Sequence, residues 1–101
     1  MTQIRSMIFS THPLKLTVDE IAKQASLSRS YFQHTYKKLF GSTVTEDIIA
    51  SRLEYAKLLL ATTDSTVKEI AELCGYETDV HFMRQFKSRT GLTPSLYRRY
   101  F

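Results

Sequence analysis

Apolar residues recur every three or four positions through most of this chain, which is the spacing of one face of an α-helix. The longest such run predicts a helix over about residues 45–61 that begins at Thr43 or Thr45. Its apolar stripe consists of Ile48, Ile49, Leu53, Ala56, Leu59 and Leu60. A shorter run predicts a helix over residues 2–11, ended by His12 and Pro13. The pattern therefore predicts an all-α fold of about seven helices.

Two capping boxes mark the starts of two short helices. Thr17 stands three residues before Glu20, and Thr66 stands three residues before Glu69. At this spacing the threonine hydroxyl accepts a hydrogen bond from the backbone N–H of the glutamate, whose carboxylate accepts one from the threonine N–H. We therefore expect a helix to begin after each threonine.

Each short helix is followed by a turn and a longer helix. Ser28 can cap a helix over residues 29–40, and Gly41 can close it. A second longer helix is predicted over residues 78–90, with Gly91 at its end.

The chain repeats itself, and the repeat defines its organisation. Glu20-Ile21-Ala22 recurs 49 positions later as Glu69-Ile70-Ala71, and beyond the turns the offset becomes 50. The later pairs are Phe32 with Phe82, Tyr36 with Phe86, Lys37 with Lys87, Gly41 with Gly91 and Thr43 with Thr93. A short capped helix, a tight turn and a longer basic helix make a helix-turn-helix, whose second helix enters the DNA major groove. We expect two such units, over about 17–41 and 66–91, joined by the linker helix.

The first reading helix, 29–40, is predicted to turn Phe32, Tyr36, Leu39 and Phe40 inward. The remaining surface offers three candidates for base contacts: Ser30, Gln33 and His34. Gln33 can pair with adenine, and His34 can donate to a guanine acceptor or to a phosphate. Three basic residues suit phosphates: Arg29, Lys37 and Lys38. The alternative is a solvated helix face that binds nothing.

The second reading helix, 78–90, places Phe82 and Phe86 on one face. Its candidates for base contacts are Asp79, Val80, His81, Met83 and Arg84. The guanidinium fork of Arg84 matches guanine, and the apolar side chains can meet a thymine methyl group or simply pack at the helix edge. Asp79 can accept from cytosine or cap the helix start. Lys87 and Thr66 are candidates for phosphates, and Arg52 can touch phosphate or pair with a carboxylate inside the domain.

Composition narrows the function classes. The 101 residues carry 14 Lys and Arg against 10 Asp and Glu, a net charge of +4 that is compatible with nucleic acid without proving it. A single cysteine, Cys74, excludes an internal disulfide and a cysteine-rich zinc site. The three histidines lack metal-ligand spacing, and no nucleophile is positioned beside a base. We therefore expect no enzyme activity, no metal and no cofactor.

The sequence has no run of about 18 apolar residues and no hydrophobic signal segment at its start. These two features predict a soluble, cytoplasmic chain that does not enter a membrane.

The chain also resembles a known family over essentially its whole length, and the signature residues lie in its C-terminal half. The matching residues are Gly75-Tyr76, His81-Phe82, Arg84, Phe86-Lys87, Gly91, Thr93-Pro94 and Tyr97-Arg98, which are similar to the C-terminal signature of AraC/XylS-type transcription regulators. The resemblance implies that residues 1–101 form an AraC-type DNA-binding domain of a bacterial regulator, with a last short helix opening at Thr93-Pro94. It further implies an activator that binds adjacent major-groove segments of double-stranded DNA and contacts RNA polymerase.

Three features depart from the family pattern. Ser26 stands where a glycine often lies, so the first turn is either strained or differently built. Asp79-Val80 replaces small or polar residues, so base preference does not carry over. No ligand-binding or dimerising domain is present, which predicts a stand-alone member or an excised C-terminal domain that dimerises through a region outside this chain.

A helical protein-binding module is the rival function. Such a module should present apolar anchors, whereas the two reading helices present Arg, Lys, Gln and His.

Overall fold

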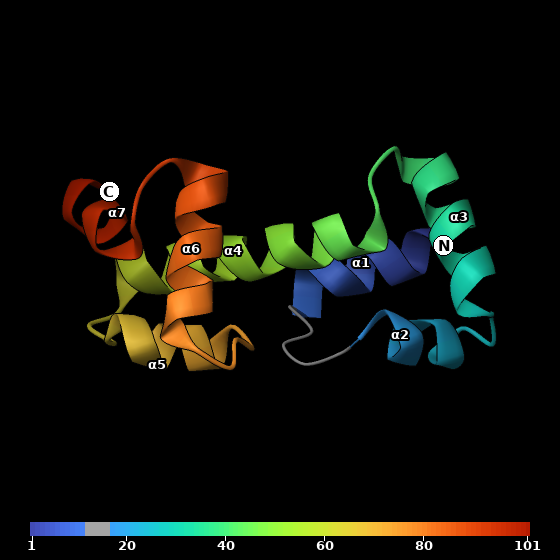
Figure 1. Ribbon diagram of the computed structural model, residues 1–101, viewed down its shortest axis with the longest axis horizontal. Helices are drawn as coiled ribbons and strands as arrows, with labels where there is room; N and C mark the ends of the chain where they lie inside the picture. The colour runs from blue at the N-terminus through green and yellow to red at the C-terminus, as the bar shows by residue number, and fades with distance from the viewer. Residues whose placement is uncertain (12–16) are drawn as a thin grey trace. The chain divides into compact units, whose positions relative to one another are not determined.

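The computed structural model describes residues 1–11 and 17–101, and all of its regular structure in these ranges is helical. The helices are α1 (Thr2–Thr11), α2 (Val18–Gln24), α3 (Arg29–Phe40), α4 (Val44–Thr62), α5 (Val67–Leu73), α6 (Asp79–Thr90) and α7 (Pro94–Tyr100), as Figure 1 shows. The all-α prediction and the helix over residues 2–11 are confirmed. The predicted stop at His12 and Pro13 lies outside the described residues.

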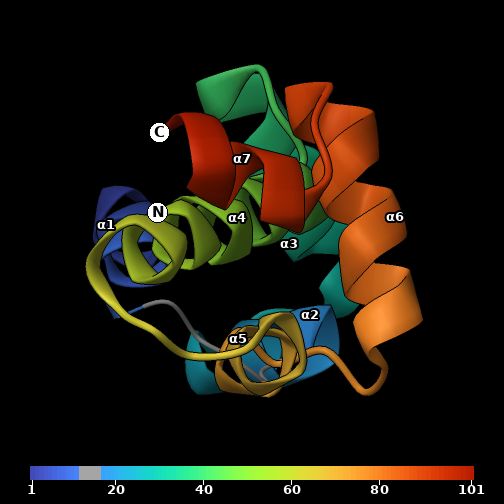
Figure 2. The same cartoon turned by 90° about the vertical axis from the view of Figure 1, so that its left-hand side faces the viewer.

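The chain divides into two compact units, which we call the first unit (Met1–Ser51) and the second unit (Arg52–Phe101). The first unit contains α1, α2, α3 and the start of α4, and the second contains the rest of α4 with α5, α6 and α7. Each unit therefore has a leading helix, a helix-turn-helix and a closing helix. Helix α4 supplies the closing helix of the first unit and the leading helix of the second. Within the second unit, α5 lies at the N-terminal end of α6 and α7 near its C-terminal end (Figure 2).

The helix starts follow the predicted caps, with one difference at Thr17. The box at Thr66 is complete, because its hydroxyl accepts from the N–H of Glu69 and its own N–H donates to the Glu69 carboxylate. At Thr17 the structure shows one of the two bonds of the box: the Thr17 hydroxyl accepts from the backbone N–H of Glu20 at 3.2 Å. A further complete box at Thr43, with both bonds to Glu46 at 3.0 Å, starts α4 at Val44, so Thr43 is the correct one of the two predicted starts.

The tight turns of the two units have the same backbone geometry. Ser26 has φ of 57° and Gly75 has φ of 85°, and the next residue in each turn donates its N–H back to the preceding short helix. The strained alternative for the first turn is therefore correct, since a side chain in the left-handed region costs about 1–2 kcal/mol. Gly75 meets the same requirement without a Cβ.

Each unit has its own core. In the first unit the buried residues are Ile8, Ile21, Ala22, Phe32, Tyr36, Val44 and Ile48, with Phe40 packed against them. In the second they include Leu53, Ala56, Leu60, Ile70, Ala71, Cys74, Tyr76, Phe82 and Phe86. The prediction that Leu39 points inward is wrong, because its side chain is 59% exposed. Phe32, Tyr36 and Phe40, four residues apart, already fill the inner face of α3.

Candidate nucleic-acid interface

The outer surface of α3 carries the candidates that the sequence predicts for the first unit. Ser30, His34, Lys37 and Lys38 are exposed, and Gln33 is half-buried. Four of these residues line one open hollow together with the cap of α4; its lining is Gln33, His34, Lys37, Lys38 and Thr43. The hollow thus combines two ammonium groups with amide, imidazole and hydroxyl groups, which are the types of group that bind phosphates and base edges.

Arg29 has an acidic partner that lies outside its own helix. Its Nη1 is 3.2 Å from Oδ2 of Asp19, which belongs to α2. Both side chains are more than half exposed, so this ion pair adds little stability and is screened by solvent. Arg29 can therefore exchange Asp19 for a phosphate at small cost, and its phosphate role stays a prediction.

The outer surface of α6 carries the candidates of the second unit. Val80, His81, Arg84 and Lys87 are exposed and Met83 is half-buried, whereas Phe82 and Phe86 on the inner face are fully buried. Among the residues that the structure describes, neither Arg84 nor Lys87 takes part in an ion pair. Both cations are thus presented to solvent without a competing carboxylate.

The start of α6 differs from the prediction by one residue. Thr78 is the capping residue, because its hydroxyl accepts from the N–H of His81 at 3.1 Å. Asp79 is the first helical residue, so the N-cap hydrogen bond comes from Thr78 and not from Asp79. Its charge still lies in the first turn, where a carboxylate favours the helix dipole.

Thr66 is already engaged by its own helix. Its N–H donates to the Glu69 carboxylate at 2.9 Å, and this hydrogen bond, with that of the Thr66 side chain, lowers the pKa of Glu69. A phosphate near Thr66 would therefore meet an ionised carboxylate whose hydrogen bonds already engage the backbone and the side chain of Thr66. Contact between Thr66 and DNA stays a prediction.

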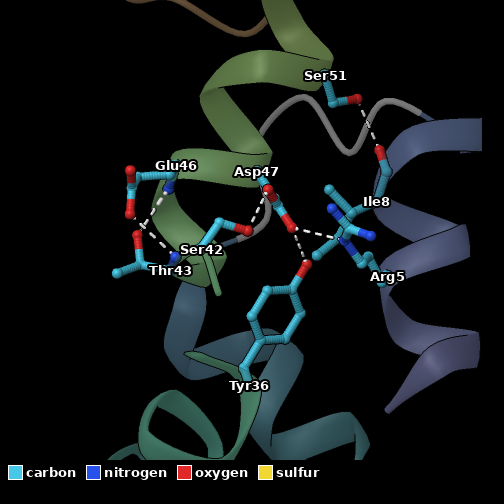
Figure 3. Close-up of polar contacts among 8 residues, drawn as sticks. All are labelled: Arg5, Ile8, Tyr36, Ser42, Thr43, Glu46, Asp47 and Ser51. Carbon is cyan, nitrogen blue, oxygen red and sulfur yellow. Dashed lines mark hydrogen bonds and ion pairs between the residues drawn. The ribbon is translucent and has the colours of Figure 1, made fainter. Parts of the chain in front are cut away.

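A buried carboxylate holds α3 in place within the first unit (Figure 3). Asp47 accepts from Arg5 Nε at 3.0 Å, from the Tyr36 hydroxyl and from Ser42 Oγ at 2.9 Å. Burial alone would raise the pKa of Asp47, but the three hydrogen bonds outweigh it and lower that pKa below its usual 3.8. Burial and the negative charge of Asp47 raise the pKa of Tyr36.

Asp47 therefore ties α1, α3 and α4 together as an ionised acceptor. This role was not predicted, because in the sequence Asp47 looks like an ordinary acidic residue in the first turn of a helix.

Two arginines of the second unit are structural. The guanidinium of Arg52 lies 5.6 Å from the centre of the Tyr76 ring, which supports an intramolecular role over phosphate binding. Arg98 donates from Nε to the carbonyl of Leu60 at 3.1 Å and from Nη2 to that of Thr63 at 3.0 Å. These carbonyls lie at the end of α4, where no further helical N–H can reach them.

Other kinds of site find little support in the described part of the chain. Cys74 is fully buried, and this burial raises the pKa of its thiol to about 12, so the thiol is protonated and unreactive. Within residues 1–11 and 17–101, no three His, Cys, Asp or Glu side chains are grouped to hold a metal ion. None of the helices described has the length and apolar character needed to cross a bilayer.

Comparison with known proteins gives a family match. The helix-turn-helix domain family matches residues 21–100. The HTH-type transcriptional regulator YtdP of Bacillus subtilis is 39% identical over 85 residues, which are 84% of this chain and 11% of that protein.

Two solved structures share the fold over almost the whole chain. The C-terminal domain of the two-component response regulator yesN from Fusobacterium nucleatum is 34% identical, with a TM-score of 0.88 over 96% of this chain and 95% of that one. The DNA-binding domain of AdpA, solved in complex with a target DNA, is 28% identical, with a TM-score of 0.89 over 97% and 88%.

The chain spans between 11% and 61% of the length of the first curated relatives that it matches. The shared region is the paired helix-turn-helix arrangement of the two units. Since the family match covers residues 21–100 and the two units reproduce the fold of these domains, the chain belongs to the AraC/XylS-type helix-turn-helix family.

Proposed function

We propose that this chain is the DNA-binding part of a sequence-specific transcription regulator, and that α3 and α6 each enter a major groove of double-stranded DNA. One observation carries the proposal. In both units the longer helix buries its aromatic face and exposes a face of cations and hydrogen-bonding groups. The AdpA domain, which has the same fold, was solved with its target DNA, and this supports the same ligand here.

The exposed residues divide into two groups by chemistry. Groups that can read base edges are Ser30, Gln33 and His34 on α3, and Asp79, Val80, His81, Met83 and Arg84 on α6. Groups that suit phosphates are Arg29, Lys37, Lys38, Thr66 and Lys87. The first group would set sequence preference, and the second would set overall affinity and register.

The continuity of α4 supports a two-part DNA site. This helix has 19 residues, roughly 28 Å at 1.5 Å per residue, and contains no proline or glycine. We propose that one copy of the chain suffices for two neighbouring major-groove segments, one for each reading helix.

Selection from random-sequence DNA tests the proposal directly. The purified chain should enrich two short specified segments separated by a spacer of fixed length. If no sequence is enriched and no duplex is bound, the chain does not recognise DNA, and the protein-binding alternative takes its place. Enrichment of only one segment would show that a single unit reads bases.

The exposed lysines should control affinity without controlling sequence. Changing Lys37, Lys38 and Lys87 together to alanine should weaken binding to all duplexes alike, because each removed ammonium group neutralises one phosphate. The slope of log affinity against log salt should fall by about one for each phosphate that is no longer neutralised. Binding titrations at several salt concentrations measure this slope. An unchanged slope would show that these lysines lie off the DNA.

Arg84 should behave in the opposite way. Arg84→Ala should cost about 1–3 kcal/mol at the preferred sequence and relax preference at one base pair, because a guanidinium fork bonds two guanine acceptors. Repeating the selection with the variant measures the change, and Lys87→Ala serves as the control. If Arg84→Ala leaves every base preference intact, Arg84 contacts the DNA backbone instead.

The wider role of the regulator is also a proposal. The family resemblance supports activation through RNA polymerase, dimerisation through a region outside this chain, a cytoplasmic location and no catalytic activity. Transcription in vitro from a promoter with the selected site distinguishes activation from repression.

A further inference from the structure

Tyr76 lies at the junction between α5 and α6 and is only 5% exposed. Its backbone N–H donates to the carbonyl of Ala71 at 3.0 Å, which fixes its main chain on α5. The preceding Gly75 takes up the left-handed conformation that turns the chain at this point. The main chain of Tyr76 is therefore held by α5.

The side chain of Tyr76 contacts α6 at three positions. Its ring centre is 5.3 Å from that of His81 and 5.2 Å from that of Phe82. Its hydroxyl donates to the side-chain oxygen of Gln85, one turn further along. Arg52 of α4 also lies over the ring, with its guanidinium carbon 5.6 Å from the ring centre. Contacts on two successive turns of one helix oppose its rotation about its own axis.

Among the residues described in the first unit, the position that corresponds to Tyr76 cannot make this contact. The internal repeat pairs Tyr76 with Leu27 and Gln85 with Thr35. Leu27 packs against the core of its unit through an aliphatic side chain, which has no group that could donate to α3. The hydroxyl contact to the reading helix thus belongs to the second unit.

Rotation of α6 matters because its reading side chains point outward. A side chain reaches about 5–6 Å from the helix axis, so a rotation of about 20° moves its tip by about 2 Å. Binding groups must be held to within about 0.5 Å and 10–20°. A small rotation would therefore separate the Arg84 guanidinium from a base edge while leaving the cation near the DNA.

We propose that Tyr76 is a positioning residue for base readout by α6, and that its hydrogen bond to Gln85 fixes the rotation at which Val80 and Arg84 meet the bases. This inference rests on the proposed DNA-binding function and adds to it the residue that sets specificity in the second unit. Burial raises the pKa of Tyr76 to about 12, so the phenol keeps its proton and donates across the physiological range.

Tyr76→Phe tests the proposal, because it removes the hydroxyl and keeps the ring. Selection and binding titrations should show a loss of about 3- to 10-fold in discrimination at the base pairs that Val80→Ala or Arg84→Ala relaxes, because the hydroxyl bond is one of several contacts to α6. Preferences that depend on Gln33, affinity for non-specific DNA and the salt slope should not change. Gln85→Leu should give the same loss, and the double variant should lose no more.

Tyr97→Phe is the matched control. It removes a hydroxyl from the same unit at a ring that packs on Phe86 at 5.6 Å, and it should leave all preferences unchanged. Three outcomes would overturn the inference. Tyr76→Phe could leave base discrimination unchanged, or it could reduce discrimination equally at the base pairs read by both units. The losses caused by Tyr76→Phe and Gln85→Leu could also add up in the double variant. None of these three outcomes contradicts the proposed DNA-binding function, provided that the wild-type chain still selects a DNA sequence. If neither Val80→Ala nor Arg84→Ala relaxes any base pair, α6 does not read bases and both proposals fall.

Discussion

Changing Asp47 to alanine should lower the free energy of unfolding of the first unit by about 2–4 kcal/mol. Three side chains donate hydrogen bonds to this carboxylate, which is 5% exposed. Tyr36 is fully buried, so its hydroxyl would lose its acceptor in a place that water does not reach. Urea unfolding measures the loss, and hydrogen exchange in α3 and α6 shows which unit opens.

Two variants separate the contributions of Asp47. Asp47→Asn keeps the shape and one carbonyl acceptor, so it should destabilise the first unit less than alanine does. Glu54→Ala removes an exposed acid of the same helix and should change stability by no more than about 0.5 kcal/mol. If Asp47→Ala unfolds like the wild type, or if Glu54→Ala costs as much, the carboxylate does not hold the unit together.

The same contacts give the stability of the first unit a pH dependence. Because the pKa of Asp47 is lower in the folded chain than its usual 3.8, the stabilisation is fully present above that value. It is lost as the pH falls through the lowered folded-state pKa, where the carboxylate takes up a proton. Urea unfolding of the wild type and Asp47→Asn, compared between about pH 6 and about pH 2, should show this loss in the wild type and not in the variant.

Local sequence signals predicted the helices well because helix starts and ends depend on neighbouring residues. Ser28 caps α3, Gly41 closes it in the left-handed conformation, and Thr66 forms its complete box. The sequence left Thr43 and Thr45 as alternative starts of α4, and the box between Thr43 and Glu46 decides for Thr43.

Contacts between residues far apart in the sequence could not be predicted in the same way. Arg5 and Asp47 are 42 positions apart, and Arg98 and Leu60 are 38 positions apart. Neither pair repeats a motif, and each depends on how helices pack within a unit. The ion pair of Arg29 with Asp19 was not predicted for the same reason, because the two residues lie on different helices.

The candidate site was predictable as a surface, since helical periodicity separates an inner from an outer face. Val80 and Arg84 are exposed as expected, opposite the buried Phe82 and Phe86. Periodicity does not give the rotation of α6 about its axis. In our proposal that rotation depends on Tyr76, whose backbone N–H is bonded to α5.

The spacing of the two DNA segments should have the largest effect on affinity. Inserting half a helical turn of DNA, about 5 base pairs, should weaken binding by about 10²–10⁴-fold. The second DNA segment then faces away from the second unit, so the affinity gained by linking the two units in one chain is lost. Helix α4 carries no proline or glycine that would let it bend and compensate. Binding titrations on the selected site with altered spacers measure the effect, and base changes within the spacer at constant length are the control.

A whole inserted turn distinguishes a rigid link from a flexible one. It returns the second segment to the same face of the duplex as the first but moves it about 34 Å further along the duplex. A continuous helix cannot stretch by that distance, so affinity should stay at the level of one bound unit. Two readers on a flexible tether would recover most of the affinity lost at the half turn. Recovery at the whole turn would therefore show that α4 does not remain one helix when the chain binds DNA.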